Sequence, residues 1–276
     1  MKNKRILITG VAGSIGSELC RQLYKHNKIF GLDINESGLH DLIADLKIFG
    51  RVGDIRDKSI IHDVFSDFKP QIIFHAAALK HVDMCEKYPS ECTKTNVNGT
   101  ENVVDEARNW ECVEKLIFIS TDKAAVPNCY MGATKKCGEI LVKNRGFTVV
   151  RFGNVLGSRG SVIPIWQRQI DEGKNLTVTD SRMKRFKMTI EEACELVIKA
   201  ANEGVGGEIF ILDMGEQVNI LELAKKIIQE SRKEVDIEMI GIRPGEVLEE
   251  RLMSEEEEKR AIKRDKFFII NGQVRI

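Results

Sequence analysis

Short apolar runs alternate with helical patterns through the first half of the chain, and this alternation limits the possible folds most strongly. Buried strands are predicted by the runs Arg5–Thr9, Lys28–Leu32, Ile72–Ala76, Lys115–Ser120 and Thr148–Phe152, with a short one near Ile48–Val52. Helices are predicted between them over Gly13–Lys25, Asn35–Leu46, Lys58–Phe65, Pro89–Asn109 and Met131–Asn144. Repeated strand–helix–strand units build a parallel sheet with helices on both faces. We therefore predict an α/β fold with a doubly wound parallel sheet.

The pattern is looser in the second half. It predicts helices over Ile163–Glu172, Thr189–Asn202 and Ile220–Ser231 and a strand over Glu208–Asp213. The charged run from Glu255 to Lys266 is typical of a solvated C-terminal helix. With no repeat or linker in view, we expect residues 1–152 to form the sheet domain. Residues 153–276 should form a smaller substrate-binding lobe, interleaved with the sheet and not folding independently.

Charge and cysteine usage exclude several classes of protein. Lys and Arg number 42, as do Asp and Glu, so no strong field points to nucleic acid or an anionic membrane. No apolar run is long enough to span a bilayer, and the chain enters a strand without a signal region. Seven scattered cysteines lack the spacing of a metal or redox site. We expect a cytoplasmic protein with reduced thiols and no metal.

A glycine-rich turn follows the first strand and opens a helix. Its residues are Thr9, Gly10, Gly13, Ser14, Ile15 and Gly16. Such glycines allow a tight turn and close approach to a pyrophosphate, which the helix N-terminus can bind. Asp33 ends the second strand at about the expected spacing of ~20 residues, where it can accept hydrogen bonds from a ribose. We predict a Rossmann-type dinucleotide site that prefers NAD over NADP, because Asp33 would repel a 2′-phosphate and no arginine follows it.

Further cofactor contacts are predicted at the ends of the next strands. Asp54, followed by Ile55, could reach the adenine, although it fits the cap or turn aspartate of the next helix equally well. The small side chains of Ala76, Ala77 and Ala78 would let the backbone lie against a dinucleotide. Lys80 could touch substrate or phosphate, and His75 and His81 are interpreted as structural. Asn96 is a cofactor-site candidate for which bonding to a neighbouring strand is the favoured interpretation.

The candidate chemistry lies after the strand Lys115–Ser120. Thr121, Asp122 and Lys123 occupy the turn, and Lys135 lies on the next helix. Ligands of open α/β sheets bind at this carboxyl edge. An ion-paired surface turn is the competing interpretation of Asp122 and Lys123.

These residues belong to a series of motifs that resembles the extended short-chain dehydrogenase/reductases. More narrowly, the chain is similar to the CapD-like polysaccharide biosynthesis family, whose members include inverting UDP-N-acetylglucosamine 4,6-dehydratases. The motifs are TGVAGSIGSEL (9–19), HAAALKHVD (75–83), NVNGTENV (96–103), STDKA (120–124), MGATKKCGE (131–139), RFGNVLGSRGSVIP (151–164), KMTIEEA (187–193), GEIFILDMGE (207–216) and IRPGEVLEE (242–250). The resemblance implies a lyase that makes a 4-keto-6-deoxy UDP-sugar for surface polysaccharide. A tightly bound NAD or NADP would take a hydride from sugar C4 and return it to C6.

The resemblance also implies roles for the catalytic cluster. Asp122 would be the acid at the C6 hydroxyl and Lys123 the base at C5, which requires a depressed lysine pKa. Lys135 would bond the nicotinamide ribose. The tyrosine that most relatives in the superfamily carry four residues before this lysine is replaced by Met131. The base at C4 is therefore open, with Tyr130, Thr121 and Asp122 as candidates.

The substrate contacts implied by the same motifs are spread over the second lobe. Asn154, Arg159, Arg185 and Arg243 would contact the UDP-sugar diphosphate, and Glu246 the uridine ribose. Lys80 would also reach the substrate. By analogy with the family, we expect a homo-oligomer that packs through the two helices Pro89–Asn109 and Met131–Asn144.

Two other functions stay open. A UDP-sugar 4-epimerase shares the fold, the cofactor and the C4 step but does not need Lys123. A non-catalytic dinucleotide-binding scaffold or sensor is favoured by Met131 alone, and Asp122, Lys123 and Lys135 argue against it.

Overall fold

Nine strands form one sheet in the computed structural model, which describes residues 1–271. In spatial order they are β14 (Ile262–Arg264), β15 (Phe267–Ile270), β11 (Ile209–Leu212), β6 (Thr148–Phe152), β5 (Lys115–Thr121), β4 (Ile72–His75), β1 (Arg5–Thr9), β2 (Lys28–Asp33) and β3 (Phe49–Val52). The neighbours from β11 to β3 are parallel. At the other edge, β15 runs antiparallel to both β11 and β14. The predicted doubly wound α/β sheet is confirmed, with all six strands of the first half.

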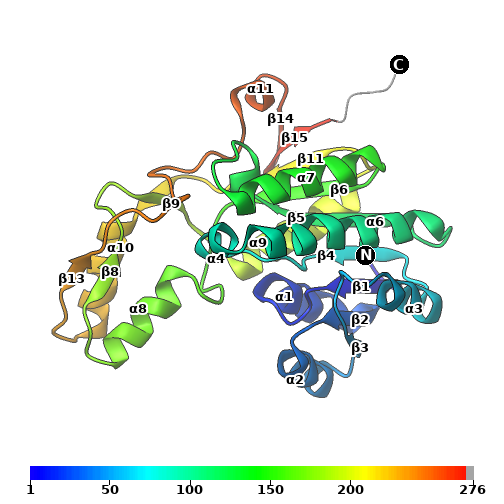
Figure 1. Cartoon of the computed structure of the whole chain (residues 1–276), viewed down its shortest axis with the longest axis horizontal. Coiled ribbons are helices and arrows are strands. Elements are labelled where there is room, and N and C mark those ends of the chain that lie inside the picture. The colour runs from blue at the N-terminus through cyan, green and yellow to red at the C-terminus, as the bar shows by residue number, and fades with distance from the viewer. Residues whose placement is uncertain (272–276) are drawn as a thin grey trace.

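Helices cover both faces of the sheet, because side chains of successive strand residues point to opposite sides. In β1, Ile6 and Ile8 join one buried cluster, whereas Leu7 joins the other. The first cluster includes side chains of α1 (Ser14–Leu23), α2 (Glu36–Leu46) and α9 (Ile190–Glu203). The second includes side chains of α3 (Lys58–Phe68), α6 (Thr100–Asn109) and α7 (Tyr130–Asn144). In Figure 1, α6 and α7 cross in front of the strands and α9 lies behind them.

Side-chain caps fix where several of these helices begin. Asn35 and Asp57 accept hydrogen bonds from the first turns of α2 and α3. Thr189 and Glu192 form a reciprocal capping box at α9. The cap of α3 is therefore Asp57, and Asp54 lies in the preceding turn.

The helix predicted over Pro89–Asn109 is interrupted. After α4 (Val82–Lys87), α5 (Pro89–Thr93) leads into a π-helical turn, Lys94–Gly99, and only then into α6. Gly99 faces Ile55 so closely that a Cβ would lie 2.7 Å from its side chain. The helix predicted over Gly13–Lys25 ends likewise as α1 followed by a 3₁₀ turn, Tyr24–His26.

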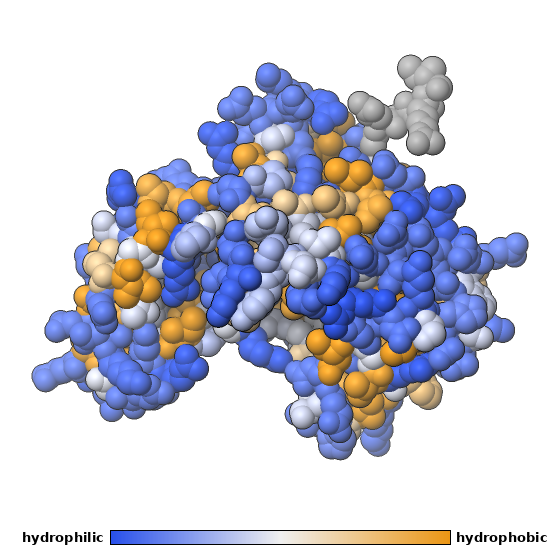
Figure 2. Space-filling view, in the orientation of Figure 1, coloured by the Kyte–Doolittle hydropathy of each residue, from blue (hydrophilic) through white to orange (hydrophobic). Residues whose placement is uncertain are grey.

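A smaller lobe stands beside the sheet, at the left of Figure 1. Its core surrounds the fully buried Trp166 and includes side chains of α8 (Val162–Asp171) and α10 (Ile220–Ser231). It contains the two-stranded pair of β8 (Leu176–Val178) with β13 (Ile237–Met239). Two further short pairs are β7 (Val155–Leu156) with β10 (Met188–Thr189) and β9 (Lys184–Phe186) with β12 (Gln217–Asn219), and side chains of β7, β9 and β10 join the first cluster of the main sheet. Figure 2 shows the surface hollowed between this lobe and the part carrying α1 and α2. Of the region 153–276 expected to form the lobe, residues 272–276 lie outside the described residues.

The C-terminal segment corrects one prediction. Instead of a solvated helix over 255–266, a single turn, α11 (Glu255–Glu258), precedes the hairpin of β14 and β15. Glu257 is buried in α11, and Phe267 and Ile270 are buried in β15. The apolar run that follows the charges thus carries the chain back onto the sheet. Within residues 1–271, no helix is both long enough and apolar enough to cross a bilayer.

Candidate active site

A cavity of about 1020 Å³ opens at the carboxyl ends of the parallel strands and is lined by residues from both halves of the chain. The predicted site residues that line it are Gly10, Gly13, Ser14, Ile15, Gly16, Ala76, Ala78, Lys80, Thr121, Lys123, Met131, Lys135, Asn154, Arg159, Arg185, Arg243 and Glu246. The predicted residues outside its lining are Thr9, Asp33, Asp54, Ile55, Ala77, Asn96, Asp122 and Tyr130. The volume is at the upper end of the range typical of small-molecule sites, about 300–1000 Å³.

The glycine turn has the close packing that a dinucleotide site requires. Gly10 has a φ of +69°, and a Cβ on it would lie 2.6 Å from the Ala77 backbone nitrogen. A Cβ on Gly16 would lie 2.2 Å from the Gly10 carbonyl oxygen. The turn therefore brings the N-terminus of α1 to the cavity, where its unpaired N–H groups can bind an anion. These residues fit a dinucleotide pyrophosphate.

The two aspartates proposed for the adenosine half differ in position. Asp33, at the end of β2, accepts hydrogen bonds from the Ala12 and Asn35 backbone N–H groups at 2.8 and 2.9 Å. Its carboxylate is thereby fixed beside the glycine turn. Asp54 is instead engaged by Arg56, whose side chain donates to it at 2.7 Å, and the hydrogen bonds of Arg56 lower the pKa of Asp54 although burial opposes this. Ile55 is buried next to it.

A buried polar chain ties β1 and β4 to the first residue of α6. Thr9 Oγ1 lies 2.6 Å from His75 Nδ1, and His75 Nε2 lies 3.0 Å from Thr100 Oγ1. Burial lowers the pKa of His75 to about 3, so the ring is neutral. Asn96 accepts from the Leu79 N–H at 2.8 Å and donates to the Leu79 carbonyl at 2.9 Å. Asn96 therefore fixes the loop after β4, which forms part of the cavity wall.

Lys135 comes from α7 and is buried behind the end of β5. Its ammonium donates to the Ile119 carbonyl and lies 3.9 Å from the centre of the Phe118 ring. Burial lowers the pKa of Lys135 to about 7. One helical turn earlier, Met131 is buried and lines the cavity, whereas Tyr130 is half exposed and does not reach it.

Asp122 and Lys123 lie in a 3₁₀ turn, Asp122–Ala124, directly after β5. Lys123 Nζ lies 3.1 Å from Asp122 Oδ1 and 2.9 Å from Glu250 Oε1. Burial alone would lower the pKa of Lys123, but the two carboxylates outweigh it and raise the pKa. The depressed lysine pKa expected from the sequence is therefore wrong for this state. Within residues 1–271, no hydrogen-bond donor reaches the other oxygen of Asp122, the buried Oδ2.

Cationic side chains surround the rest of the cavity. Lys80 donates to the Arg159 carbonyl at 2.7 Å, and Arg159 reaches back to the Ala12 carbonyl at 2.8 Å. Burial and the Arg159 charge lower the pKa of Lys80. Arg185 is mostly buried, whereas Arg243 is exposed. The backbone N–H of Arg243 donates to the Glu246 carboxylate at 3.0 Å.

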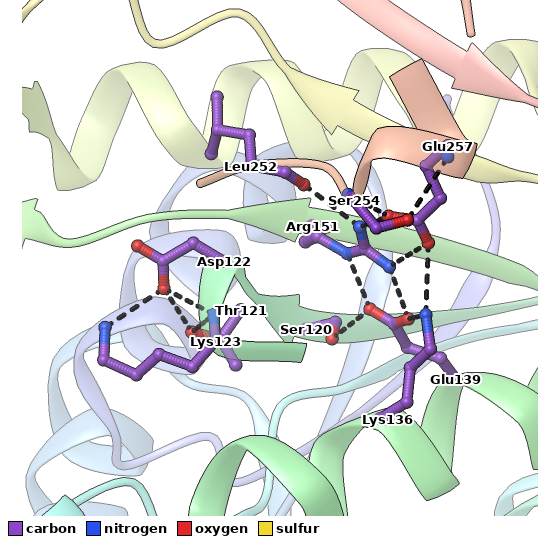
Figure 3. A network of polar contacts seen from close by, with 10 residues as sticks. All are labelled: Ser120, Thr121, Asp122, Lys123, Lys136, Glu139, Arg151, Leu252, Ser254 and Glu257. Carbon is purple, nitrogen blue, oxygen red and sulfur yellow. Dashed lines mark hydrogen bonds and ion pairs between the residues drawn. The ribbon is translucent and has the colours of Figure 1, made fainter. Parts of the chain in front are cut away.

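A charged network lies beside the turn of Asp122 and Lys123 (Figure 3). The fully buried Arg151 donates to Glu139 at 2.6 and 2.9 Å and to Glu257 at 2.7 and 3.0 Å. Glu139 also accepts from Ser120 at 2.6 Å, and Arg151 donates to the Leu252 carbonyl at 3.0 Å. The network therefore joins the end of β5 to the segment that carries Glu250.

A family model described as "Polysaccharide biosynthesis protein" matches residues 6–272. The chain belongs to this family.

Its relatives include proteins with more than one activity in their names. The capsular polysaccharide biosynthesis protein CapD of Staphylococcus aureus is 44% identical over 93% of this chain. The match covers 46% of CapD, so this chain spans about half the length of that relative. An inverting UDP-N-acetylglucosamine 4,6-dehydratase of Campylobacter jejuni is 35% identical over 99% of the chain and 84% of its own length. A UDP-glucose 4-epimerase of Rickettsia rickettsii is 36% identical over 94% of this chain and 80% of its own length. The solved structure of Pen from Bacillus thuringiensis superimposes with a TM-score of 0.94 at 35% identity, over 99% of this chain and 90% of Pen.

Two parts of this family member's site were missed from the sequence. Glu250 ends the IRPGEVLEE motif but was assigned no role, and the Arg151 network joins residues more than 100 positions apart. Arg151 lies in a strand of mostly apolar residues. A charged side chain in such a strand must be paired when it is buried, and this was the available signal.

Proposed function

We propose that this protein is a nicotinamide-dinucleotide-dependent UDP-N-acetylglucosamine 4,6-dehydratase of the C5-inverting type. The observation that carries the proposal is the pairing of Asp122 and Lys123 beside one cavity that also holds the glycine turn and Lys135. An acid and an amine on neighbouring residues suit an elimination across adjacent carbons, since one group serves each carbon. A dehydratase relative of 35% identity supports the same reaction.

The cofactor would lie along the glycine turn. The pyrophosphate would take the N-terminus of α1 at Gly13, and the Asp33 carboxylate would accept from the adenosine ribose, which favours NAD. When bound, the nicotinamide would take a hydride from sugar C4 and return it to C6. Lys135, buried at the inner end of the cavity, would hold the nicotinamide ribose.

Asp122 and Lys123 would carry the elimination. The Lys123 amine takes the C5 proton, while Asp122 protonates the leaving C6 hydroxyl. Asp122 Oδ2 has no hydrogen-bond partner within the described residues, so it is the oxygen free to carry the proton for that hydroxyl. Return of a proton to C5 from the opposite face would invert that carbon.

Removal of the proton from the C4 hydroxyl is assigned to Thr121 and Lys135. Both line the cavity, and Lys135 can accept a proton near neutral pH because its pKa is about 7. Tyr130 lies outside the lining, and Met131 has no proton to move. Arg185 and Arg243, together with Arg159 next to the glycine turn, would hold the substrate diphosphate.

A UDP-sugar 4-epimerase is the second candidate, because an epimerase relative is as similar as the dehydratase. Incubation of purified protein with UDP-N-acetylglucosamine, without added cofactor, separates the two by mass spectrometry and proton NMR. Loss of one water with a 4-keto-6-deoxy product supports dehydration and a retained cofactor. An isomer of unchanged mass supports the epimerase, and an unchanged sugar with NAD or NADP added argues against both.

Assembly is a further part of the proposal. We expect a homo-oligomer that packs through the helices of Pro89–Asn109 and Met131–Asn144, and the half-exposed Ile140 of α7 supports such a contact. Sedimentation velocity that gives only a monomer would contradict it.

A further inference from the structure

Lys123 has three oxygen partners, and one of them comes from a distant part of the chain. Asp122 Oδ1, Glu250 Oε1 and Asn154 Oδ1 lie 3.1, 2.9 and 3.4 Å from Nζ. A lysine ammonium has three N–H donors, so all three are engaged. The shortest of these contacts is the one to Glu250.

Glu250 is held firmly at the cavity wall. Its side chain is 6% exposed and its backbone carbonyl accepts from Gln217 at 2.9 Å. Two residues earlier, the Leu248 carbonyl accepts from Arg185 at 3.2 Å. Two residues later, the Leu252 carbonyl accepts from Arg151. The network shown in Figure 3, which includes the contact of Arg151 with Leu252, thus also fixes the segment Leu248–Leu252 that carries Glu250.

The charges facing Lys123 favour its protonated form. Asp122 and Glu250 are the carboxylates in contact with it. Arg185 Nη2 lies 4.0 Å from Glu250 Oε1 and partly offsets that carboxylate. The Cys129 thiol also lies near Lys123, and burial raises its pKa, so it stays neutral. One cation between two carboxylates leaves this cluster with one proton that can move.

We propose that Glu250 is a positioning residue for Lys123, and that it holds the amine so that one proton is shared between Lys123 and Asp122. The inference rests on the proposed dehydration. Transfer of that proton from the ammonium to Asp122 gives a neutral amine and a carboxylic acid without changing the total charge. The amine then takes the C5 proton as the C–H bond breaks. Asp122 gives its proton to the C6 oxygen, the C–O bond breaks, and water leaves. The cluster returns to an ammonium and two carboxylates.

The test compares Glu250→Gln with Glu249→Gln, its neighbour in the chain. Glu249 is 57% exposed and pairs with Lys184 at the surface, so its loss should leave turnover unchanged. Glu250→Gln keeps the shape but removes one negative charge, which should lower kcat by at least about 10-fold. The alkaline limb of the kcat–pH profile of Glu250→Gln should also move by about one to three pH units toward lower pH, because Lys123 loses one of its two carboxylate partners. A Glu250→Gln profile that superimposes on the wild type after scaling would overturn the proposal.

A second measurement does not depend on turnover. The pH dependence of Lys123 acetylation by acetic anhydride, followed by peptide mass spectrometry, reports the lysine pKa directly, because only the neutral amine is acetylated. It should fall in Glu250→Gln and stay near the wild-type value in Glu250→Asp and Glu249→Gln. If this shift occurs in a protein that dehydrates no UDP-sugar, the proposed function fails while the role of Glu250 toward Lys123 stands. An unchanged Lys123 pKa in folded Glu250→Gln refutes that role.

Discussion

Replacing Arg151 by methionine should destabilise the protein strongly, because it leaves Glu139 and Glu257 buried without their main cation. Removing one partner of a buried ion pair costs about 3–5 kcal/mol. The Arg151 hydrogen bonds and charge overcome the effect of burial and lower the pKa of Glu257 from 4.5 to about 2, which corresponds to ~3 kcal/mol. Lys136 still lies 3.1 Å from Glu257 and 3.6 Å from Glu139, so we expect the lower end of the range.

Urea unfolding at pH 7, followed by circular dichroism, measures this cost. The matched control is Arg145→Met. Arg145 bonds Asp105 at 2.7 Å, but that carboxylate is about half exposed, and such a pair contributes about 1 kcal/mol or less. Equal costs for the two arginine variants would refute the assignment of Arg151 as the centre of a buried network.

The pH dependence gives an independent check. Because the folded pKa of Glu257 is depressed, its contribution is complete above the unfolded pKa of about 4.5 and is lost as the pH falls toward 2. The stability difference between wild type and Arg151→Met should therefore shrink over that window. A difference that stays constant from pH 7 to the lower limit contradicts the argument.

Three further predictions concern catalysis. Lys123→Ala should reduce water loss from UDP-N-acetylglucosamine by at least about 100-fold, whereas an epimerase would keep its C4 exchange; mass spectrometry and NMR separate these results. Gly153→Ala places a methyl group 2.9 Å from Asp122 Oδ2 and 3.0 Å from the buried Phe186 ring, so kcat should fall about 10- to 100-fold and Tm should also decrease; unchanged kcat would contradict that position. The acid limb of kcat/KM should lie near pH 7, because Lys135, whose pKa burial lowers to about 7, loses its ability to accept a proton below it; a flat profile through pH 7 refutes this role.

The fold could be predicted from the sequence where local patterns carry it. Strand–helix alternation predicted the strands β1 to β6 along the chain, because each strand and helix is encoded by consecutive residues. The C-terminal segment was mispredicted because the charges at 255–266 match a solvated helix. The burial of Glu257 depends on Arg151, and sequence distance hides that pairing.

The candidate site was predictable in composition but not in electrostatics. The motifs place Asp122 and Lys123 on one turn, yet the protonation of Lys123 depends on Glu250, brought in by a loop of the second half. Likewise, Tyr130 and Met131 are neighbours in sequence, and only the start of α7 decides that Met131 faces the cavity.

The most direct test of the proposed dehydration follows one hydrogen atom. Purified protein is given UDP-N-acetylglucosamine labelled with deuterium at C4, and the product is analysed by NMR. The proposed mechanism predicts that the deuterium appears in the C6 methyl group of a 4-keto product, because the hydride leaves C4 and returns to C6. Deuterium that remains at C4 in the recovered sugars, or that is lost to solvent, would contradict it.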